Sequence, residues 1–297
     1  DNTHLTWRSS TELIVSGRTD THRFSADGTH LGSLPTRHWS IPLPGDRVLG
    51  LGWRGSQVIS LADPDAAPLQ LAETGGGEKG ALYLGCLLPD GTALATGSSS
   101  IRRWNLETGA VVGRFKARCK PTSLTVSPDG TTLAAAGIND SGRIWLHALP
   151  DGTPTLLATL QGERASATVL ELVWTPDGSA LLAATNDGRV WRVPREGKPT
   201  LFADNLTRKR SYGYSSTATL NLSLSPGGRW LAVSFPFSSD TFFLILSAAD
   251  GRVVKKVTGH KRPVHGLAFS PDGKLLASMD VEFRQVMVWD VAKWKLK

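Results

Sequence analysis

Short apolar segments separated by tight polar turns recur along the whole chain. In "GLAFSPDGKLLASMD", residues 266–280, an apolar run leads into Ser-Pro-Asp-Gly and then into a second apolar run. Proline fixes φ for a turn, the aspartate side chain accepts a hydrogen bond from nearby backbone, and glycine tolerates a positive φ. Runs of this length on both sides of such a turn predict two antiparallel strands joined by a hairpin.

The same phrase returns at six other places. It is clear in "SLTVSPDGTTLAAAG", "ELVWTPDGSALLAAT", "NLSLSPGGRWLAVSF" and "GCLLPDGTALATGSS", and weaker in "LTWRSSTELIVSG" and "LGWRGSQVISLA" near the start. Anchored on their first strands, the copies lie at Leu5, Leu51, Gly85, Leu124, Leu172, Leu222 and Leu267. A period of roughly 34–50 residues is typical of repeat architectures.

Each copy continues into two further runs. The third run carries a large apolar residue a few positions before a glycine, as in "IRRWNLETG" and "RVWRVPREG", and a fourth run such as "AVVGRFKA" follows. Seven copies of four antiparallel strands predict an all-β fold, a seven-bladed β-propeller of four-stranded antiparallel blades. We expect one propeller domain over residues 1–297, and because the chain starts at Asp1 without Met, we expect it to be part of a longer protein.

The last copy resembles a complete WD repeat. Gly259-His260 precedes its first strand, Ser270-Pro271-Asp272-Gly273 forms its turn, and Trp289-Asp290 ends its third strand. The chain is therefore identified as a divergent member of the WD-repeat β-propeller family, with this one well-matching repeat at residues 259–290. The other copies lack the Gly-His pair, and the tryptophans of their third strands are not followed by aspartate.

The resemblance implies a buried hydrogen-bond network in this copy. In the family, a His, a Ser or Thr, an Asp and the Trp of one blade can form it, and His260, Ser278 and Trp289 match three of these positions. The Asp position is shifted or lost, with Asp280 and Glu282 as the nearest substitutes.

Large aromatic side chains recur at two positions of the repeat. Large side chains that recur at the same position from blade to blade are expected to be core residues. We therefore expect these aromatics to fill the space between neighbouring sheets. One set stands near the end of the first strand and the other in the third strand: Trp7, Trp53, Trp174 and Phe269, and Trp104, Trp145, Trp191 and Trp289.

No linear motif of a catalytic or metal site is present. The sequence lacks a Gly-x-Ser-x-Gly elbow, a phosphate-binding loop, a His-Glu-x-x-His pair and a Cys-x-x-Cys pair, and its seven histidines are scattered over different copies. We therefore expect no catalytic residues, no cofactor and no metal. An enzyme or small-molecule binder at the channel mouth stays open as the alternative, because propeller enzymes assemble sites from loops of several blades.

Positive charge gathers in the connections between blades. The chain has 33 Lys and Arg against 26 Asp and Glu, a net charge of +7. Arg, Tyr and Trp are frequent in interface hot spots, so basic connections containing aromatics predict a docking surface. Acidic residues in neighbouring loops could instead pair with these cations as ordinary solvated surface. The candidate partner-binding residues are Arg37, His38, Trp39, Arg208, Lys209, Arg210, Tyr212, Tyr214, Lys261 and Arg262.

These features favour a non-catalytic protein-interaction module, acting as a scaffold, adaptor or sensor. We expect its partner to be an acidic protein or other domains of the same polypeptide. Nucleic acid, stacked on the aromatics of the basic loops, is the third alternative, although +7 over 297 residues is modest for a dedicated nucleic-acid binder. With two cysteines and no apolar stretch long enough to span a bilayer, we expect a cytoplasmic protein without membrane contact.

Overall fold

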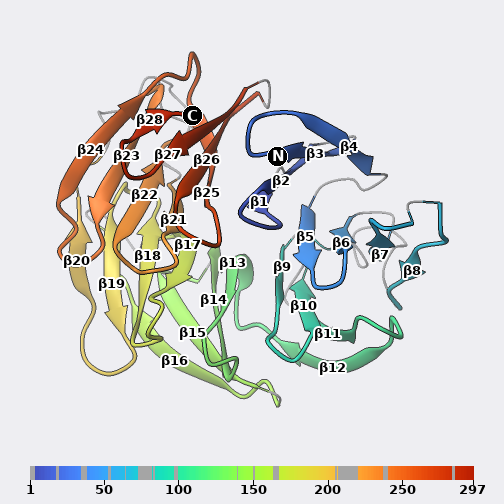
Figure 1. Ribbon diagram of the computed structural model, residues 1–297. Coiled ribbons are helices and arrows are strands. Elements are labelled where there is room, and N and C mark those ends of the chain that lie inside the picture. Colours follow the sequence, from blue (N-terminus) through green and yellow to red (C-terminus); the bar gives the residue numbers. More distant parts are fainter. Residues whose placement is uncertain are drawn as a thin grey trace.

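Seven small β-sheets form a ring around a central channel (Figure 1). The computed structural model describes residues 4–17, 20–34, 39–52, 55–63, 65–72, 82, 84–96, 100–138, 140–149, 151–162, 167–204, 206, 220–236, 240–282 and 285–297. Every sheet has four antiparallel strands, so the predicted seven-bladed propeller is confirmed. The described residues contain strands and turns but no helix, and hence no helix that could span a bilayer.

Each blade is built from four consecutive strands, starting with the one nearest the channel. Blade 1 comprises β1 (His4–Trp7), β2 (Glu12–Ser16), β3 (Thr21–Ser25) and β4 (His30–Leu34). Blade 2 comprises β5 (Trp39–Leu43), β6 (Arg47–Leu51), β7 (Gln57–Ser60) and β8 (Leu69–Gln70). Blade 3 comprises β9 (Leu84–Leu87), β10 (Thr92–Thr96), β11 (Ser100–Asn105) and β12 (Val111–Lys116).

The remaining blades are the more regular ones. Blade 4 comprises β13 (Lys120–Val126), β14 (Thr132–Ile138), β15 (Arg143–Ala148) and β16 (Pro154–Thr159). Blade 5 comprises β17 (Val169–Trp174), β18 (Ala180–Thr185), β19 (Val190–Pro194) and β20 (Thr200–Ala203). Blade 6 comprises β21 (Asn221–Leu224), β22 (Trp230–Ser234), β23 (Phe242–Ser247) and β24 (Val253–Thr258), and blade 7 comprises β25 (Val264–Phe269), β26 (Leu275–Asp280), β27 (Val286–Asp290) and β28 (Lys295–Leu296).

The Ser-Pro-Asp-Gly turns hold the first two strands of a blade together as the sequence predicts. In blade 7 the Ser270 hydroxyl donates to Asp272 Oδ1 over 2.7 Å, and the Lys274 N–H donates to the same oxygen over 3.1 Å. The Leu275 N–H donates to Ser270 Oγ, and Gly273 takes a φ of 69° that a residue with a Cβ rarely adopts. The polar side chains of this turn therefore have a structural role.

Blade 7 takes all four of its described strands from the C-terminal segment, with β28 paired to β27 at Trp289 and Asp290. The ring closes where blade 1 packs against blade 7. There the Trp7 indole N–H donates to the Ala268 carbonyl over 2.9 Å, and Leu5 lies so close to Gly266 that a Cβ on the glycine would meet it at 3.3 Å. Among the described residues, closure thus rests on packing and a hydrogen bond between the two blades, without exchange of a strand.

The repeated aromatics form much of the core, but not uniformly. Trp7, Trp174 and Phe269 are buried at the ends of first strands, and Trp104 and Trp289 are buried in third strands. Trp145 and Trp191, which we also expected in the core, are only half-buried. The expectation that they share the position of Trp104 and Trp289 is wrong, because they stand two residues earlier in their strands. Trp145 reaches the rim of its blade, where its indole N–H donates to the Asp140 carboxylate over 2.6 Å.

The sequence-based register of blade 2 is wrong. Leu51, expected in the first strand, ends the second strand β6, and Trp53, expected beside it in the core, lies outside the described residues. The first strand is β5, and it joins β6 through Pro44-Gly45-Asp46, in which Gly45 and Asp46 both have positive φ. This turn places glycine before aspartate, so a search for Pro-Asp-Gly passes over it.

Candidate functional site

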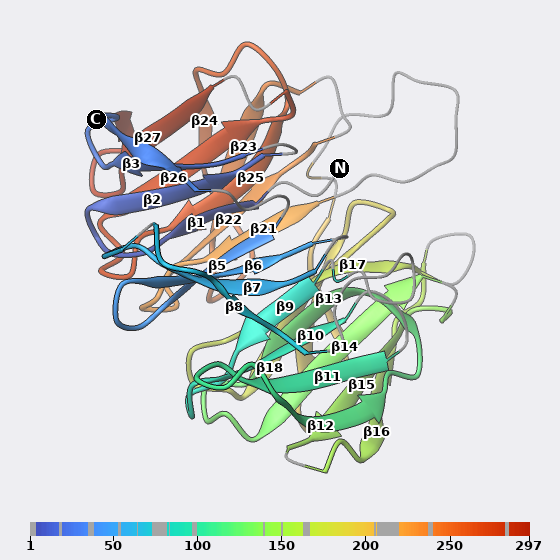
Figure 2. The ribbon, with the colours of Figure 1, turned by 90° about the vertical axis from the view of Figure 1, so that its right-hand side faces the viewer.

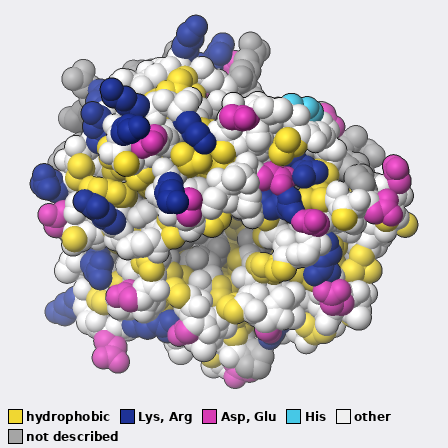
Figure 3. Space-filling model, viewed as in Figure 1, with side chains coloured by type: hydrophobic (Ala, Val, Ile, Leu, Met, Phe, Trp, Pro, Cys, Tyr) yellow, Lys and Arg dark blue, Asp and Glu magenta, His cyan; other side chains and the backbone are white. Residues whose placement is uncertain are grey.

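The ring has two faces with different kinds of connection. The connections between blades and those from second to third strands open on one side, which we call the loop face. The hairpin turns from first to second and from third to fourth strands open on the other side, the turn face. Figure 3 views the turn face, which is hollowed near the middle of the ring, and Figure 2 views the ring from its side.

Most of the predicted docking residues lie outside the described residues. These are Arg37, His38, Arg208, Lys209, Arg210, Tyr212 and Tyr214. Of Trp39 only the backbone, at the start of β5, is described. On the loop face the structure places Lys261, which is exposed, and Arg262, whose Nε lies 2.8 Å from Glu282 Oε1. Both partners of this ion pair are about 40% exposed, so it contributes less than about 1 kcal/mol.

The family's buried network is present in blade 7. The Ser278 hydroxyl lies 2.7 Å from His260 Nε2, and the Trp289 indole N–H donates to the same hydroxyl over 2.7 Å. Burial lowers the pKa of His260, against which the nearby charge of Asp280 acts. Asp280 is buried, whereas Glu282 pairs with Arg262 at the surface, so Asp280 is the better substitute for the family's aspartate.

A run of cations along the outer edge of blade 6 was missed by the sequence reasoning. Lys255 and Lys256 are exposed on β24. The connection that follows β24 carries Lys261 and Arg262 on the loop face. Lys and Arg also gather around β24 and β28 in Figure 3, where the exposed side chains are Arg252, Lys255, Lys256, Lys293, Lys295 and Lys297. The signal that could have found it is the segment "RVVKKVTGHKR", in which two lysines of the outer strand precede Lys261 and Arg262.

Side chains on the inner strands connect neighbouring blades along the channel. The acceptors Ser123, Glu171 and Asn221 stand at the same position of three successive blades. Each accepts a hydrogen bond from the backbone N–H of a leucine in the first strand of the next blade. The distances are 3.0 Å from Leu172 to Ser123, 2.6 Å from Leu222 to Glu171, and 3.3 Å from Leu267 to Asn221. Burial raises the pKa of Glu171 to about 8, although the Leu222 N–H acts in the opposite direction. A raised carboxyl pKa can mark a functional site, but the ladder gives Glu171 a structural role.

Glu171 should make the stability of the propeller depend on pH. Between the ordinary glutamate pKa and about 8 the folded protein holds a proton that the unfolded chain releases, so the free energy of unfolding should fall as pH rises through this range. The slope from one proton is at most about 1.4 kcal/mol per pH unit. Urea unfolding at several pH values should show a shallower slope for Glu171→Gln, whose amide oxygen can still accept from Leu222.

Glu196→Gln is the matched control for this pH dependence. Glu196 is exposed in the turn between β19 and β20, so its replacement should leave the slope unchanged. Equal slopes for the wild-type protein and Glu171→Gln would show that Glu171 does not bind a proton on folding.

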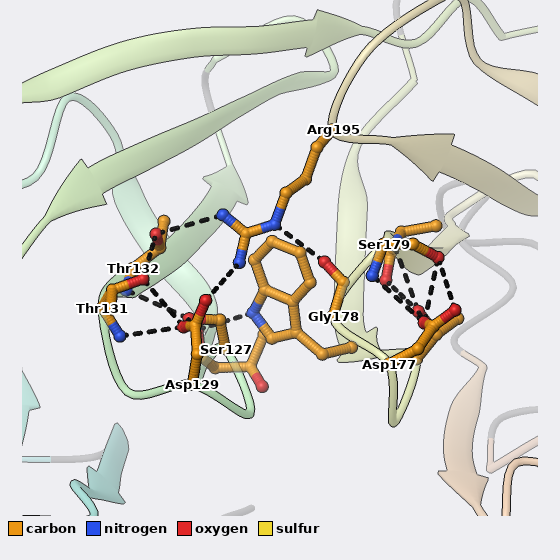
Figure 4. Close-up of polar contacts among 12 residues, drawn as sticks. Ser127, Asp129, Thr131, Thr132, Asp177, Gly178, Ser179 and Arg195 are labelled. Carbon is orange, nitrogen blue, oxygen red and sulfur yellow. Dashed lines mark hydrogen bonds and ion pairs between the residues drawn. The ribbon is translucent and has the colours of Figure 1, made fainter.

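On the turn face, Arg195 of blade 5 reaches across to the turn of blade 4 that carries Asp129 and Thr132 (Figure 4). Arg195 lies with its guanidinium carbon 4.6 Å from the centre of the Trp174 ring, and its Nε donates to the Gly178 carbonyl over 2.7 Å. Its terminal nitrogens reach Thr132 Oγ1 at 3.3 Å and Asp129 Oδ2 at 3.5 Å in blade 4. Arg195 therefore connects two blades through stacking, hydrogen bonds and charge.

No group of three or more His, Cys, Asp or Glu side chains suited to a metal ion occurs in the described part of the chain. The structure brings together an extended basic edge, a ladder of side chains around the channel, and grooves between blades. These features define a repeat protein of the β-propeller class.

Comparisons with known proteins give the family. Residues 251–280 match the family model WD40, "WD domain, G-beta repeat". This match, the WD repeat-containing relative described below, the seven four-stranded blades and the His-Ser-Trp network together support a WD-repeat family for this chain.

The similar proteins are longer than this chain. An uncharacterized WD repeat-containing protein of Synechocystis is 28% identical over 141 residues, which is 46% of this chain and 35% of that protein. Periodic tryptophan protein 2 of Arabidopsis thaliana is 30% identical over 57% of this chain and 17% of its own length. Coronin-7 of Rattus norvegicus is 30% identical over 68% of this chain and 20% of its own length. The matched segments thus cover only about a third or less of these relatives.

A solved structure resembles the whole ring. A chain of Kuenenia stuttgartiensis hydrazine synthase superposes with a TM-score of 0.75, covering 97% of this chain and 95% of that chain. Sequence identity is 17%, so the likeness concerns the fold alone.

Proposed function

We propose that this propeller is a non-catalytic protein-interaction module, a scaffold, adaptor or sensor that binds an acidic protein partner. WD-repeat propellers generally bind protein partners, which supports the class of function. The contact surface in this proposal comprises the predicted loop-face residues and the basic edge that leads to them.

The observation that carries the proposal is the continuity of exposed charge from β24 onto the loop face. Lys255 and Lys256 stand in the middle of the strand, followed by Lys261 and Arg262 in the connection to blade 7. Val253 and Val254, 45% and 38% exposed, give the same strand an apolar surface. Cations beside exposed apolar groups suit an acidic protein, because charge steers the encounter and apolar contact slows dissociation.

Charge reversal should separate this surface from other basic parts of the ring. We expect Lys255→Glu/Lys256→Glu and Lys261→Glu/Arg262→Glu to slow association with a captured partner by about tenfold or more at low salt. The Tyr212→Ala/Tyr214→Ala variant should mainly speed dissociation. Arg114→Glu/Lys116→Glu, on the corresponding outer strand of blade 3, is the matched control and should bind normally. If only the control variant loses capture, the proposed surface is wrong.

Salt dependence tests the nucleic-acid alternative on the same variants. Five phosphate contacts would cost about 0.7–0.9 log units of affinity each per tenfold rise in salt, whereas a protein held partly by apolar contacts should be less sensitive. Nuclease treatment that abolishes capture would also favour nucleic acid.

We further propose a reducing compartment such as the cytoplasm. Cys86 is half-buried and Cys119 is buried, and both thiols are free. Burial raises the pKa of each thiol to about 12, which keeps them protonated and unreactive.

A further inference from the structure

Between blades 5 and 6 there is no arginine at the position from which Arg195 bridges blades 4 and 5. The backbone defines the equivalent positions: the Arg195 N–H donates to the Ser179 carbonyl, and the Ala248 N–H donates in the same way to the Arg229 carbonyl, each over 3.0 Å. Alanine therefore stands where blade 5 has its bridging arginine. Leu224 ends β21 as Trp174 ends β17, so the aromatic platform is missing as well.

A cleft of about 550 Å³ lies between blades 5 and 6, where an arginine at position 248 would otherwise extend. Its lining includes the equivalents of the arginine and of three of its contacts: Ala248 for Arg195, Leu224 for Trp174, Gly228 for Gly178, and Asp177 for Asp129. Ligand pockets commonly measure about 300–1,000 Å³, so the space suits a peptide side chain with its neighbours.

Asp177 is held in the same way as the aspartate that meets Arg195. Its Oδ1 accepts from the Thr175 hydroxyl over 2.5 Å and from the Ser179 N–H over 3.1 Å, which fixes the carboxylate on its turn. These bonds, that of the Thr175 hydroxyl first, lower the pKa of Asp177 to about 2, so the group is ionised at neutral pH. Its Oδ2 accepts from the Ser179 hydroxyl, whereas the same oxygen of Asp129 accepts from Arg195.

The cleft also holds a cation. Arg192, on β19, lines it together with Leu182 and Leu224. Arg192 makes no hydrogen bond or close ion pair with the described residues, although its charge acts on Asp177. A ligand that complements both charges must therefore carry one of each sign.

We propose that this cleft binds a partner peptide in which an arginine stands next to an acidic residue. The guanidinium occupies the place that Arg195 has in the neighbouring groove, donating to Asp177 and to the Gly228 carbonyl while its flat face rests on Leu224. The neighbouring carboxylate pairs with Arg192. Arginine suits this site better than lysine because its planar group donates in two directions at once. A lone anion is disfavoured because Asp177 would repel it.

This site lies on the turn face and does not depend on the docking surface proposed for the loop face. A simple probe is the blocked peptide acetyl-Gly-Arg-Asp-Gly-amide, titrated into the whole chain and followed by amide NMR. We expect saturable shifts at Gly227, Gly228, Ala248 and Ala249. The same peptide with citrulline in place of arginine should bind at least about tenfold more weakly, because a charge-assisted hydrogen bond is lost.

Three variants test the assignment. Asp177→Asn keeps an acceptor for the turn and should weaken the probe at least about tenfold, whereas Asp129→Asn, at the aspartate that meets Arg195, is the matched control and should leave its affinity unchanged. Ala248→Arg should supply an internal arginine and abolish binding. Thermal melting establishes that each variant is folded, and Asp177→Asn carries the test if Ala248→Arg is not.

The outcomes separate the two proposals. Lys261→Glu/Arg262→Glu should leave the probe's affinity unchanged whether or not the loop face binds a protein. Equal affinity for the arginine and citrulline peptides, equal affinity of Asp177→Asn and the wild-type protein, or no saturable shifts at the cleft would each overturn the proposal.

Discussion

Replacing Trp289 by alanine is expected to lower the free energy of unfolding by about 3–5 kcal/mol, the usual loss for a buried large-to-small change. Trp289 is 4% exposed, packs edge-on against Phe243 of blade 6 with ring centres 5.6 Å apart, and donates to the Ser278 hydroxyl. Alanine would leave a cavity between blades 6 and 7 and remove one bond of the network. Urea unfolding measures the change.

Trp191→Ala provides a matched comparison. Trp191 lies in the third strand of blade 5, two residues before the position that corresponds to Trp289, which Val193 holds. It is only half-buried, and its indole N–H has no hydrogen-bond partner among the described residues. Its replacement should cost clearly less than that of Trp289. Equal losses would mean that the network and the tighter burial of Trp289 add nothing to stability.

Replacing Gly251 by alanine is expected to cost on the order of 3 kcal/mol. Gly251 lies in the turn between β23 and β24 with a φ of 75°, and a Cβ there would come within 1.9 Å of the Phe202 carbonyl of blade 5. Left-handed backbone alone costs alanine about 1–2 kcal/mol, and the clash with backbone adds to it because a carbonyl cannot rotate away as a side chain does. Thermal and urea unfolding both report the loss.

Gly91→Ala separates the two contributions. Gly91 has a φ of 79°, but nothing lies within 4 Å of its hypothetical Cβ, so its replacement should cost only the backbone term. The difference between the two variants measures the close approach of blade 6 to blade 5. If both variants lose the same stability, that approach is not important for packing.

The regular blades could be predicted because their signals are local. A turn such as Ser270-Pro271-Asp272-Gly273 contains the groups that hold it, so four adjacent residues predict a hairpin wherever they occur. The network of His260, Ser278 and Trp289 in blade 7 was implied by the resemblance of this repeat to the WD family, and the structure shows it. In blade 2 the turn reads Pro44-Gly45-Asp46, with glycine before aspartate. The sequence-based assignment therefore missed this hairpin and took the next one, between β6 and β7, as the start of the blade.

The sequence by itself determined the seven-fold repetition, the four strands of each blade and the hairpins, because each depends on apolar periodicity and turn chemistry within a few residues. Only the tertiary structure decided how blades meet. Whether an arginine bridges two neighbouring blades depends on the residue at the equivalent positions Arg195 and Ala248. These face the turns that carry Asp129 and Asp177 in the preceding blade, 66 and 71 residues away along the chain. The raised pKa of Glu171 likewise arises from burial, and its side chain meets the backbone of the next blade only in the folded ring.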